Sequence, residues 1–455
     1  METDFATLKP LIAIVFVLVY IGLIAFKHKR PYVVWSAIAV LFVAIIIKIP
    51  GQSIGNTLFQ FLKAISWNVL GIFTGMSIIA QLFIKSNVPT WLADWFILRS
   101  RTAGVAMLWL CALSSAISAF VDNVATVLIV APIALAIAQR LKASPVPVLI
   151  GIAISSNLQG MATLVGDPPS MITAGFISRQ GTNFGFNEFF LFQGKPSLFF
   201  VVQFGAIFGF LVLYWFFRVY RQPVAKPTPV KIESLVPTGI LLSVITCLAM
   251  ATKFDPNFTY FGGTVCILGA LIGLLWHYFY ASEKSGGSMD GEAGWNANVE
   301  IVKTYDIETP LFLAGIFILV FLVEQSGMIS DIAAMIQRLF GANLFLTFTM
   351  IVWISVLLSG FIDNIPYIMV MLPVTAELGT KLGGSAFYVL AFGLLVGACL
   401  GGNCTPVGAS ANVVTIGLLQ RQGYSVSFGE FMKIGVPFTI AATFAGYLFI
   451  WFVWS

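Results

Sequence analysis

An apolar run from Ala103 to Ala138 contains one aspartate near its middle, in the segment Phe120-Val121-Asp122-Asn123-Val124. The run is too long for one membrane span of about 20 residues and too short for two spans with a turn. An acidic side chain at such a depth costs at least ~2.5 kcal/mol, and by default it marks a functional site. We therefore predict two short helices that meet near the middle of the membrane. Asp122 and Asn123 form the tip, because Asp and Asn suit tight turns.

The same pattern occurs a second time, 241 or 242 residues further along the chain. One constant offset through several landmarks predicts two copies of one unit, at residues 67–220 and 308–455. The matching segments are Asp122-Asn123 with Asp363-Asn364, Pro132 with Pro373, Thr163-Leu-Val-Gly166-Asp-Pro-Pro-Ser170 with Thr405-Pro-Val-Gly408-Ala-Ser-Ala-Asn412, and Phe186-Asn-Glu188 with Phe428-Gly-Glu430.

The composition is that of an integral membrane protein with little soluble mass. Hydrophobic residues make up 59% of the chain and charged residues 9%, whereas soluble domains carry about 25% charged residues. The formal net charge of +5 is better explained by the excess of basic residues on the inner side of membrane proteins than by binding of nucleic acid. The five cysteines lie in or beside apolar runs without CxxC spacing, so they indicate neither disulfides nor zinc.

Each predicted copy contains a second long apolar run, at 146–177 and at 387–419. The first is interrupted by Gly166-Asp167-Pro168-Pro169, and two prolines must break a helix there. The second is interrupted from Gly401 to Asn412. Irregular backbone at this depth is tolerated only where protein or a water-filled cavity receives it. Both runs therefore predict broken transmembrane helices beside a cavity.

Two regions lie outside the copies. Residues 1–66 are expected to form spans 1 and 2, at Leu11–Phe26 and Tyr32–Ile49, followed by a surface connection over 50–66. Residues 221–307 are expected to hold a linker, two extra spans (238–251 and 261–280) and a mobile polar loop over 281–306. The fold class that follows is an all-α polytopic membrane protein with ten crossings and two re-entrant hairpins.

The basic residues indicate how the copies are oriented. With the cluster Lys27–Arg30 inside, about two thirds of the 24 Lys and Arg residues fall on the inner side. The first hairpin then enters from the cytoplasm and the second from outside, which predicts inverted-topology repeats. Secondary carriers use this architecture and bind substrate and ions at the midplane between the repeats.

The predicted site combines acidic tips, neutral oxygen donors and the restarting helices. Asp122 and Asp363 can bind a cation or a proton, and a Na⁺ site is predicted at Asp122, Asn123, Asp363 and Asn364. The new helix N-termini after Gly166 and Gly408 supply N–H donors for an anion. The full predicted set is Asp122, Asn123, Thr126, Asn157, Thr163, Gly166, Asp167, Pro168, Ser170, Asp363, Asn364, Asn403, Thr405, Gly408, Ser410 and Asn412.

Some of these residues also have a purely structural interpretation. Asp122 or Asp363 could pair with a neighbouring span, and Asp167, which precedes Pro168, could simply cap the restarting helix. Asp167 has no counterpart in the second copy, where Ala409 stands, so the predicted site is asymmetric in charge.

These motifs resemble the ion transporter superfamily, and within it the ArsB/NhaD group of CitMHS-like permeases, in particular the branch of the pink-eyed dilution P protein. The segments that carry the resemblance are Phe120-Val-Asp-Asn-Val-Ala-Thr126-Val-Leu, Thr163-Leu-Val-Gly-Asp-Pro-Pro-Ser170, Phe361-Ile-Asp-Asn-Ile-Pro366 and Gly401-Gly-Asn-Cys-Thr-Pro-Val-Gly-Ala-Ser-Ala-Asn-Val-Val414. The resemblance implies a carrier that couples transport to Na⁺ or H⁺. The sequence differs from the family pattern at Ser170, at Cys404-Thr-Pro406 and at Leu158-Gln159.

Three functions remain open at this point. The first is a secondary carrier of a small anion or metalloid oxyanion, arsenite-like or carboxylate-like, coupled to Na⁺ or H⁺. The second is a Na⁺/H⁺ antiporter that uses the hairpin aspartates, and the third is an anion channel. No enzymatic activity and no cofactor beyond the coupling ion is expected. We expect a multi-pass protein of a prokaryotic plasma membrane whose partners are the lipid bilayer and a small ion, with a homodimer as an option and no nucleic acid.

Overall fold

The computed structural model consists almost entirely of helices, and it describes residues 5–26, 29–49, 52–140, 144–224, 230–255, 258–284, 291–383 and 385–455. Lys27 and His28, part of the predicted basic cluster, lie outside these ranges. Among the described residues, eight helices are long and apolar enough to cross a membrane. Ten crossings were predicted, and the remaining two are the broken helix at 146–177 and the span at 238–251. The apolar helices there, Val146–Gly160 and Val236–Ala251, are shorter than those eight.

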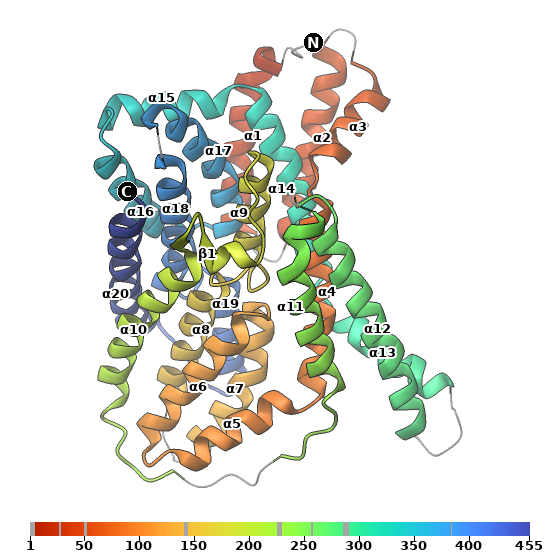
Figure 1. Ribbon diagram of the computed structural model, residues 1–455, viewed down its shortest axis with the longest axis vertical. Coiled ribbons are helices and arrows are strands. Elements are labelled where there is room, and N and C mark those ends of the chain that lie inside the picture. The colour runs from red at the N-terminus through yellow and green to blue at the C-terminus, as the bar shows by residue number, and fades with distance from the viewer. Residues whose placement is uncertain are drawn as a thin grey trace.

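The first half of the chain contains the first hairpin and the first broken helix (Figure 1). Its helices are η1 (Phe5–Leu8), α1 (Lys9–Ala25), α2 (Arg30–Lys48), α3 (Ile54–Ala64), α4 (Trp67–Lys85), α5 (Val88–Arg99), α6 (Ala103–Ser118), α7 (Asn123–Arg140), α8 (Val146–Gly160), α9 (Pro168–Arg179), η3 (Asn187–Phe189) and α10 (Leu198–Phe217). The two-residue strands β1 (Leu191–Phe192) and β2 (Lys195–Pro196) pair in antiparallel fashion.

After α11, α12 and α13, the α-helices of the second half from α14 onward follow the same order as those of the first half from α4 onward. Its helices are α11 (Val236–Phe254), α12 (Phe261–Lys284), α13 (Gly291–Thr304), α14 (Glu308–Gln325), α15 (Met328–Phe340), α16 (Leu344–Ser359), α17 (Asn364–Leu382), α18 (Ala386–Gly401), η4 (Gly402–Cys404), α19 (Ser410–Arg421) and α20 (Phe428–Trp454).

Both predicted hairpins and both predicted breaks are present. Helices α6 and α7 meet at residues 119–122, and α16 and α17 meet at 360–363. Helix α8 ends at Gly160, and α9 begins at Pro168. Proline is well tolerated at the first position of a helix, because the N–H group that it lacks would have no partner within the helix. Figure 1 shows the α6–α7 hairpin rising from the lower end and the α16–α17 hairpin descending from the upper end, so the two hairpins point in opposite directions.

The two hairpins also begin in the same way. The surface helices α5 and α15 follow left-handed residues, Asn87 with φ of 60° and Gly327 with φ of 77°. Thr102 then caps α6 by accepting from Val105 N at 3.4 Å, and Asn343 caps α16 by accepting from Leu346 N at 3.1 Å. Side-chain caps at matching positions fix where each hairpin starts.

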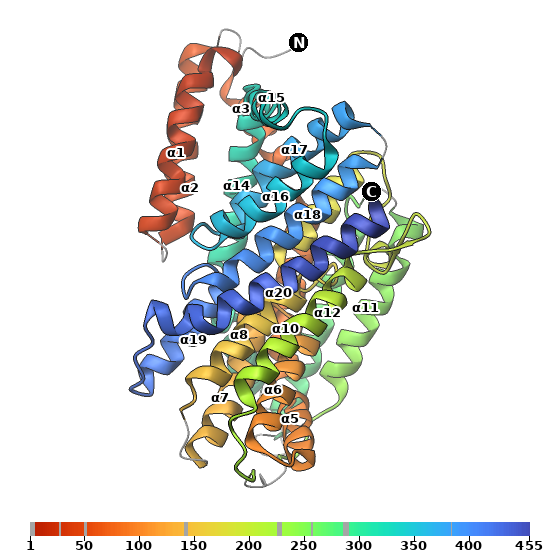
Figure 2. The same cartoon turned by 90° about the vertical axis from the view of Figure 1, so that its left-hand side faces the viewer.

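The centre of the molecule is formed by the two helices that precede the breaks. Every residue of α8 except Pro147 is buried, and so is every residue of α18 except Phe387 and Tyr388. Figure 2 shows α16, α18 and α20 running side by side across the molecule, above α6, α8 and α10. The ends of α8 and α18 are therefore held rigidly where the breaks begin.

The structure adds detail to one prediction outside the repeats and contradicts another. Within the predicted surface connection 50–66, α3 occupies 54–64 and is capped by Ser53, which accepts from Asn56 N at 3.2 Å. The polar segment 281–306 is not a loop throughout. Helix α12 continues to Lys284 and α13 covers 291–304, while 285–290 lie outside the described residues.

Candidate functional site

A cavity of about 350 Å³ lies where both hairpin tips meet the restarting helices. Its walls come from α2, α4, α8, both tips, the first residues of α9 and α19, the end of α13 and the start of α14. Eight of the predicted site residues line it, namely Asp122, Asn123, Asn157, Asp167, Pro168, Asp363, Asn364 and Ser410. The other eight, which are buried but do not line the cavity, are Thr126, Thr163, Gly166, Ser170, Asn403, Thr405, Gly408 and Asn412.

At the first tip, Asp122 caps helix α7. Its Oδ2 accepts from Val124 N at 3.0 Å and from Ala125 N at 3.4 Å. No basic side chain within the described residues forms an ion pair with it. Asn123 is fixed by Ser118, whose Oγ donates to Asn123 Oδ1 at 2.6 Å. Within the part of the chain that the structure describes, the first tip thus presents to the cavity a carboxylate that has no cationic partner.

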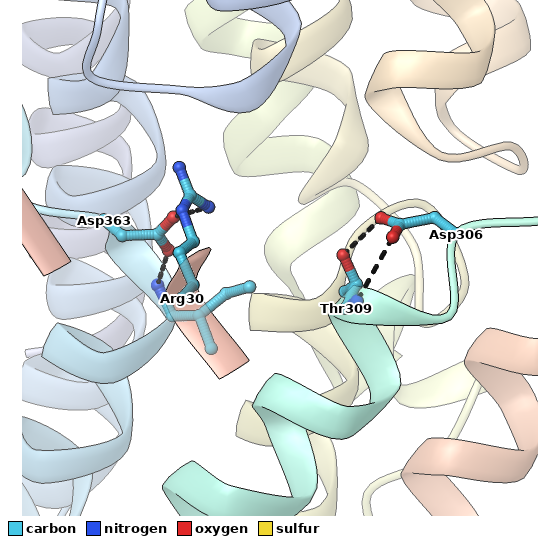
Figure 3. Close-up of polar contacts among 5 residues, drawn as sticks. Arg30, Asp306, Thr309 and Asp363 are labelled. Carbon is cyan, nitrogen blue, oxygen red and sulfur yellow. Dashed lines mark hydrogen bonds and ion pairs between the residues drawn. The ribbon is translucent and has the colours of Figure 1, made fainter. Parts of the chain in front are cut away.

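At the second tip, Asp363 is paired with Arg30. Oδ1 of Asp363 accepts from Ile365 N at 3.0 Å, and its Oδ2 lies 2.5 Å from Arg30 Nη1 (Figure 3). The two side chains are 13% and 22% exposed, respectively. Arg30 is the first residue of α2, so the partner comes from outside the predicted repeats. Sequence reasoning missed it, since Arg30 belonged to a basic cluster that was assigned only to topology.

At the first break, Asp167 both caps a helix and lines the cavity. Its Oδ1 accepts from Ser170 N at 3.0 Å and from Ser170 Oγ at 2.7 Å. Its Oδ2 lies 3.8 Å from Sγ of Cys399, on α18 of the other half. Asp167 is 2% exposed. The geometry is therefore compatible with both interpretations of Asp167, as the cap of α9 and as a residue of the ion site.

A network of three asparagines joins the halves, and one of its members, Asn157, lines the cavity. Nδ2 of Asn157 donates to Oδ1 of Asn403 at 2.8 Å and to Oδ1 of Asn412 at 3.0 Å. Asn403 Nδ2 donates to Ile154 O, and Asn412 Nδ2 donates to Gly402 O and Thr405 O. The amides of Asn403 and Asn412 are thus engaged with protein groups and hold the second break against α8.

Matched threonines and glycines attach each hairpin tip to its break. Thr163 Oγ1 donates to Ala119 O, and Thr405 Oγ1 donates to Gly360 O. A Cβ on Gly166 would lie 2.3 Å from Gly160 O, and one on Gly408 would lie 2.5 Å from Gly402 O. Only glycine permits this close approach. Thr126 is also directed to the tip, since its Oγ1 donates to Val121 O at 3.4 Å.

Carboxylates dominate the charge of the cavity. Asp306 lies just before α14, where it accepts from Glu308 N at 3.0 Å. It also accepts from Thr309 N at 3.3 Å and from Thr309 Oγ1 at 2.5 Å (Figure 3). Among the described residues that line the cavity, the acidic ones are Asp122, Asp167, Asp306, Glu308 and Asp363, and the basic one is Arg30. Neither Asp306 nor Glu308 was predicted as a site residue.

Comparison with known proteins agrees with this architecture. The citrate transporter family model matches residues 11–397 and 264–455. An uncharacterized transporter of Mycobacterium tuberculosis is 30% identical over 422 residues, which cover 91% of this chain and 93% of the relative. The P protein of Sus scrofa is 27% identical over 87% of this chain, and the match spans 54% of that longer protein.

A solved structure shares the fold. The crystal structure of the YdaH transporter of Alcanivorax borkumensis superimposes with a TM-score of 0.56 over 87% of this chain and 86% of that one, at 14% sequence identity. The described helices are apolar and long enough to cross the membrane repeatedly. This chain is therefore a multi-pass membrane transporter that belongs to the citrate transporter family.

Proposed function

We propose that the protein is a secondary active transporter of a small anion or metalloid oxyanion, coupled to Na⁺ or H⁺. The observation that carries this proposal is one cavity on which both hairpin tips and both restarting helices converge. Alternating access would expose this midplane site first to one side of the membrane and then to the other. Relatives in Mycobacterium support a prokaryotic plasma membrane as its location.

The coupling cation would bind at the first tip. Asp122 supplies a carboxylate, and Asn123 lies beside it on the same wall of the cavity. Asp167 faces the same cavity and can add a second carboxylate. Hard cations prefer such oxygen ligands, while a carboxylate without a cation can instead take a proton.

The anion would bind against the restarting helices. Pro168 and Pro169 of α9 and Ser410 and Ala411 of α19 line the cavity, so the positive ends of two helix dipoles face it. The carboxylates repel an anion until a cation or proton neutralises them. The cation should therefore bind before the anion, which couples the two in one transport cycle.

A second candidate is Na⁺/H⁺ antiport. It is favoured by the excess of carboxylates over basic side chains in the cavity, because such a site attracts cations without needing an anionic substrate. The two candidates differ in whether an anion moves with the cation.

Flux into proteoliposomes separates the two functions. The purified protein would be reconstituted and given citrate, another carboxylate, arsenite or no anion, with a Na⁺ or a pH gradient. The proposal expects gradient-driven uptake of one anion and little cation flux without it. Na⁺-driven proton movement of the same size with and without every anion would instead establish the antiporter.

A further inference from the structure

The hairpin tips are matched in sequence, but they differ in their counter-charge. Asp122 and Asp363 occupy equivalent positions, and each caps the second helix of its hairpin. Only Asp363 has a basic partner among the described residues, the guanidinium of Arg30 at 2.5 Å. The first tip is open to a cation from solution, whereas the second already holds a positive charge that belongs to the chain.

The position of Arg30 is unfavourable without this contact. Arg30 is the first residue of α2, where the helix dipole is positive and repels a basic side chain. Helix α2 is itself anchored on α14, because Trp35 Nε1 donates to Leu311 O at 2.9 Å. The guanidinium therefore reaches Asp363 from a fixed helix, and the attraction of the carboxylate offsets the repulsion of the dipole.

The two kinds of counter-charge behave differently during transport. A Na⁺ ion or a proton can leave the first tip for solution. An arginine guanidinium carries a permanent positive charge, and that of Arg30 is covalently attached to α2. It can therefore neutralise Asp363 without being transported.

We propose that Arg30 is a tethered cation that occupies, at the second tip, the position that the exchangeable coupling cation takes at the first tip. The carrier then binds one exchangeable cation per chain, at Asp122, although its two tips match in sequence. This inference rests on the proposed cation coupling, and it adds the number of coupling cations that each chain binds.

Cation binding by purified protein in detergent tests the inference without an anionic substrate. The probe is Na⁺, measured as ²²Na⁺ bound per chain, with proton uptake on a pH shift as the parallel measurement. Wild type should bind one cation. Arg30→Gln frees the carboxylate of Asp363, so this variant should bind two cations. Its melting temperature should then depend twice as steeply on the logarithm of the cation concentration. Arg30→Lys keeps the charge and should bind one.

Two further variants keep the test specific. Arg30→Gln combined with Asp363→Asn removes both charges and should return binding to one cation. Lys29→Gln removes a neighbouring exposed charge and should behave as wild type. One bound cation in Arg30→Gln, or two in wild type, would overturn the tethered cation while leaving cation coupling intact. A wild-type protein that takes up neither Na⁺ nor protons would overturn the proposed function as well.

Discussion

Asn157 on α8 and Cys399 on α18 occupy equivalent positions, and each contacts the restarting helix of the opposite half. Asn157 Nδ2 donates to Asn412 Oδ1 at 3.0 Å, near the start of α19. Cys399 Sγ lies 3.8 Å from Oδ2 of Asp167, the cap of α9. In these matched positions the first half supplies an amide and the second a thiol. The asymmetry between Asp167 and Ala409 is thus accompanied by a second difference, at the residues of α8 and α18 that contact the opposite break.

The tip aspartates should differ in their effects on transport. Asp122→Asn removes the tip carboxylate that has no basic partner among the described residues, so gradient-driven flux should fall to background while the protein still folds. Asp363→Asn leaves the charge of Arg30 unpaired in the cavity, which favours an anion and hinders a cation. It should therefore weaken the response to the cation but retain anion binding. Uptake in proteoliposomes and ²²Na⁺ binding would measure both, and identical behaviour of the two variants would contradict the assigned asymmetry.

The local part of the fold could be predicted because it is encoded in short segments. The prolines at 168 and 169 break the helix wherever it packs, and the length of the apolar run from Ala103 to Ala138 permits little other than a hairpin. The helices at 54–64 and 291–304 were not predicted, because both segments are short and mix apolar residues with Gly, Asn and charged residues. Each is a short amphipathic helix whose identity depends on what it packs against.

The cavity could be predicted only in part, for a physical reason. Residues at the tips and breaks carry local signals, namely a charge within an apolar run or a helix breaker. Arg30 and Asp363 are 333 positions apart, and nothing local distinguishes Arg30 from the adjacent basic residues. Asp306 likewise resembles an ordinary residue before a helix. Their place in the cavity follows from how α2 and α14 pack, which one sequence does not reveal.

Two substitutions should separate the helix-capping role of Asp167 from the role of its negative charge. Asn caps helices about as well as Asp, so Asp167→Asn should fold normally but lose part of its cation dependence. Asp167→Ala removes the acceptor for Ser170 N and should also lower stability by ~1 kcal/mol. Thermal unfolding and cation-driven flux would be measured for both. If Asp167→Asn transports as wild type and Asp167→Ala is merely less stable, the carboxylate serves only as a cap.

The two hairpins should be accessible from opposite sides of the membrane. Ser144 follows α7 and Lys381 lies near the end of α17, and both are exposed. Single cysteines at these positions, in a chain whose other cysteines are replaced, should react with an impermeant maleimide from opposite faces of oriented vesicles. Reaction of both from one face would be incompatible with inverted hairpins.

The asparagine network should be important for stability. Asn157→Ala leaves the buried Oδ1 atoms of Asn403 and Asn412 without their donor, and each unpaired acceptor typically costs about 1–3 kcal/mol. Gln159 on the same helix is a matched control, because its Oε1 has no hydrogen-bond partner among the described residues. Gln159→Met should therefore change the melting temperature little. Equal losses in the two variants would show that packing of α8, rather than the network, determines stability.

Gly160 should be required for cation binding through its contact with the first tip. A Cβ at this position would lie 2.4 Å from Asn123 Oδ1, so Gly160→Ala must displace the side chain beside Asp122. Cation affinity should fall even if the variant folds, because the displaced group lines the cavity.

Gly417 provides the control for Gly160, since no atom lies within 4 Å of the Cβ that it would carry. Gly417→Ala lies within α19 and should leave cation binding unchanged, with a gain of up to ~1 kcal/mol from helix propensity. Equilibrium binding of ²²Na⁺ and thermal unfolding of both variants would be compared. If Gly160→Ala bound the cation as wild type does, Asn123 could not be a fixed part of the cation site.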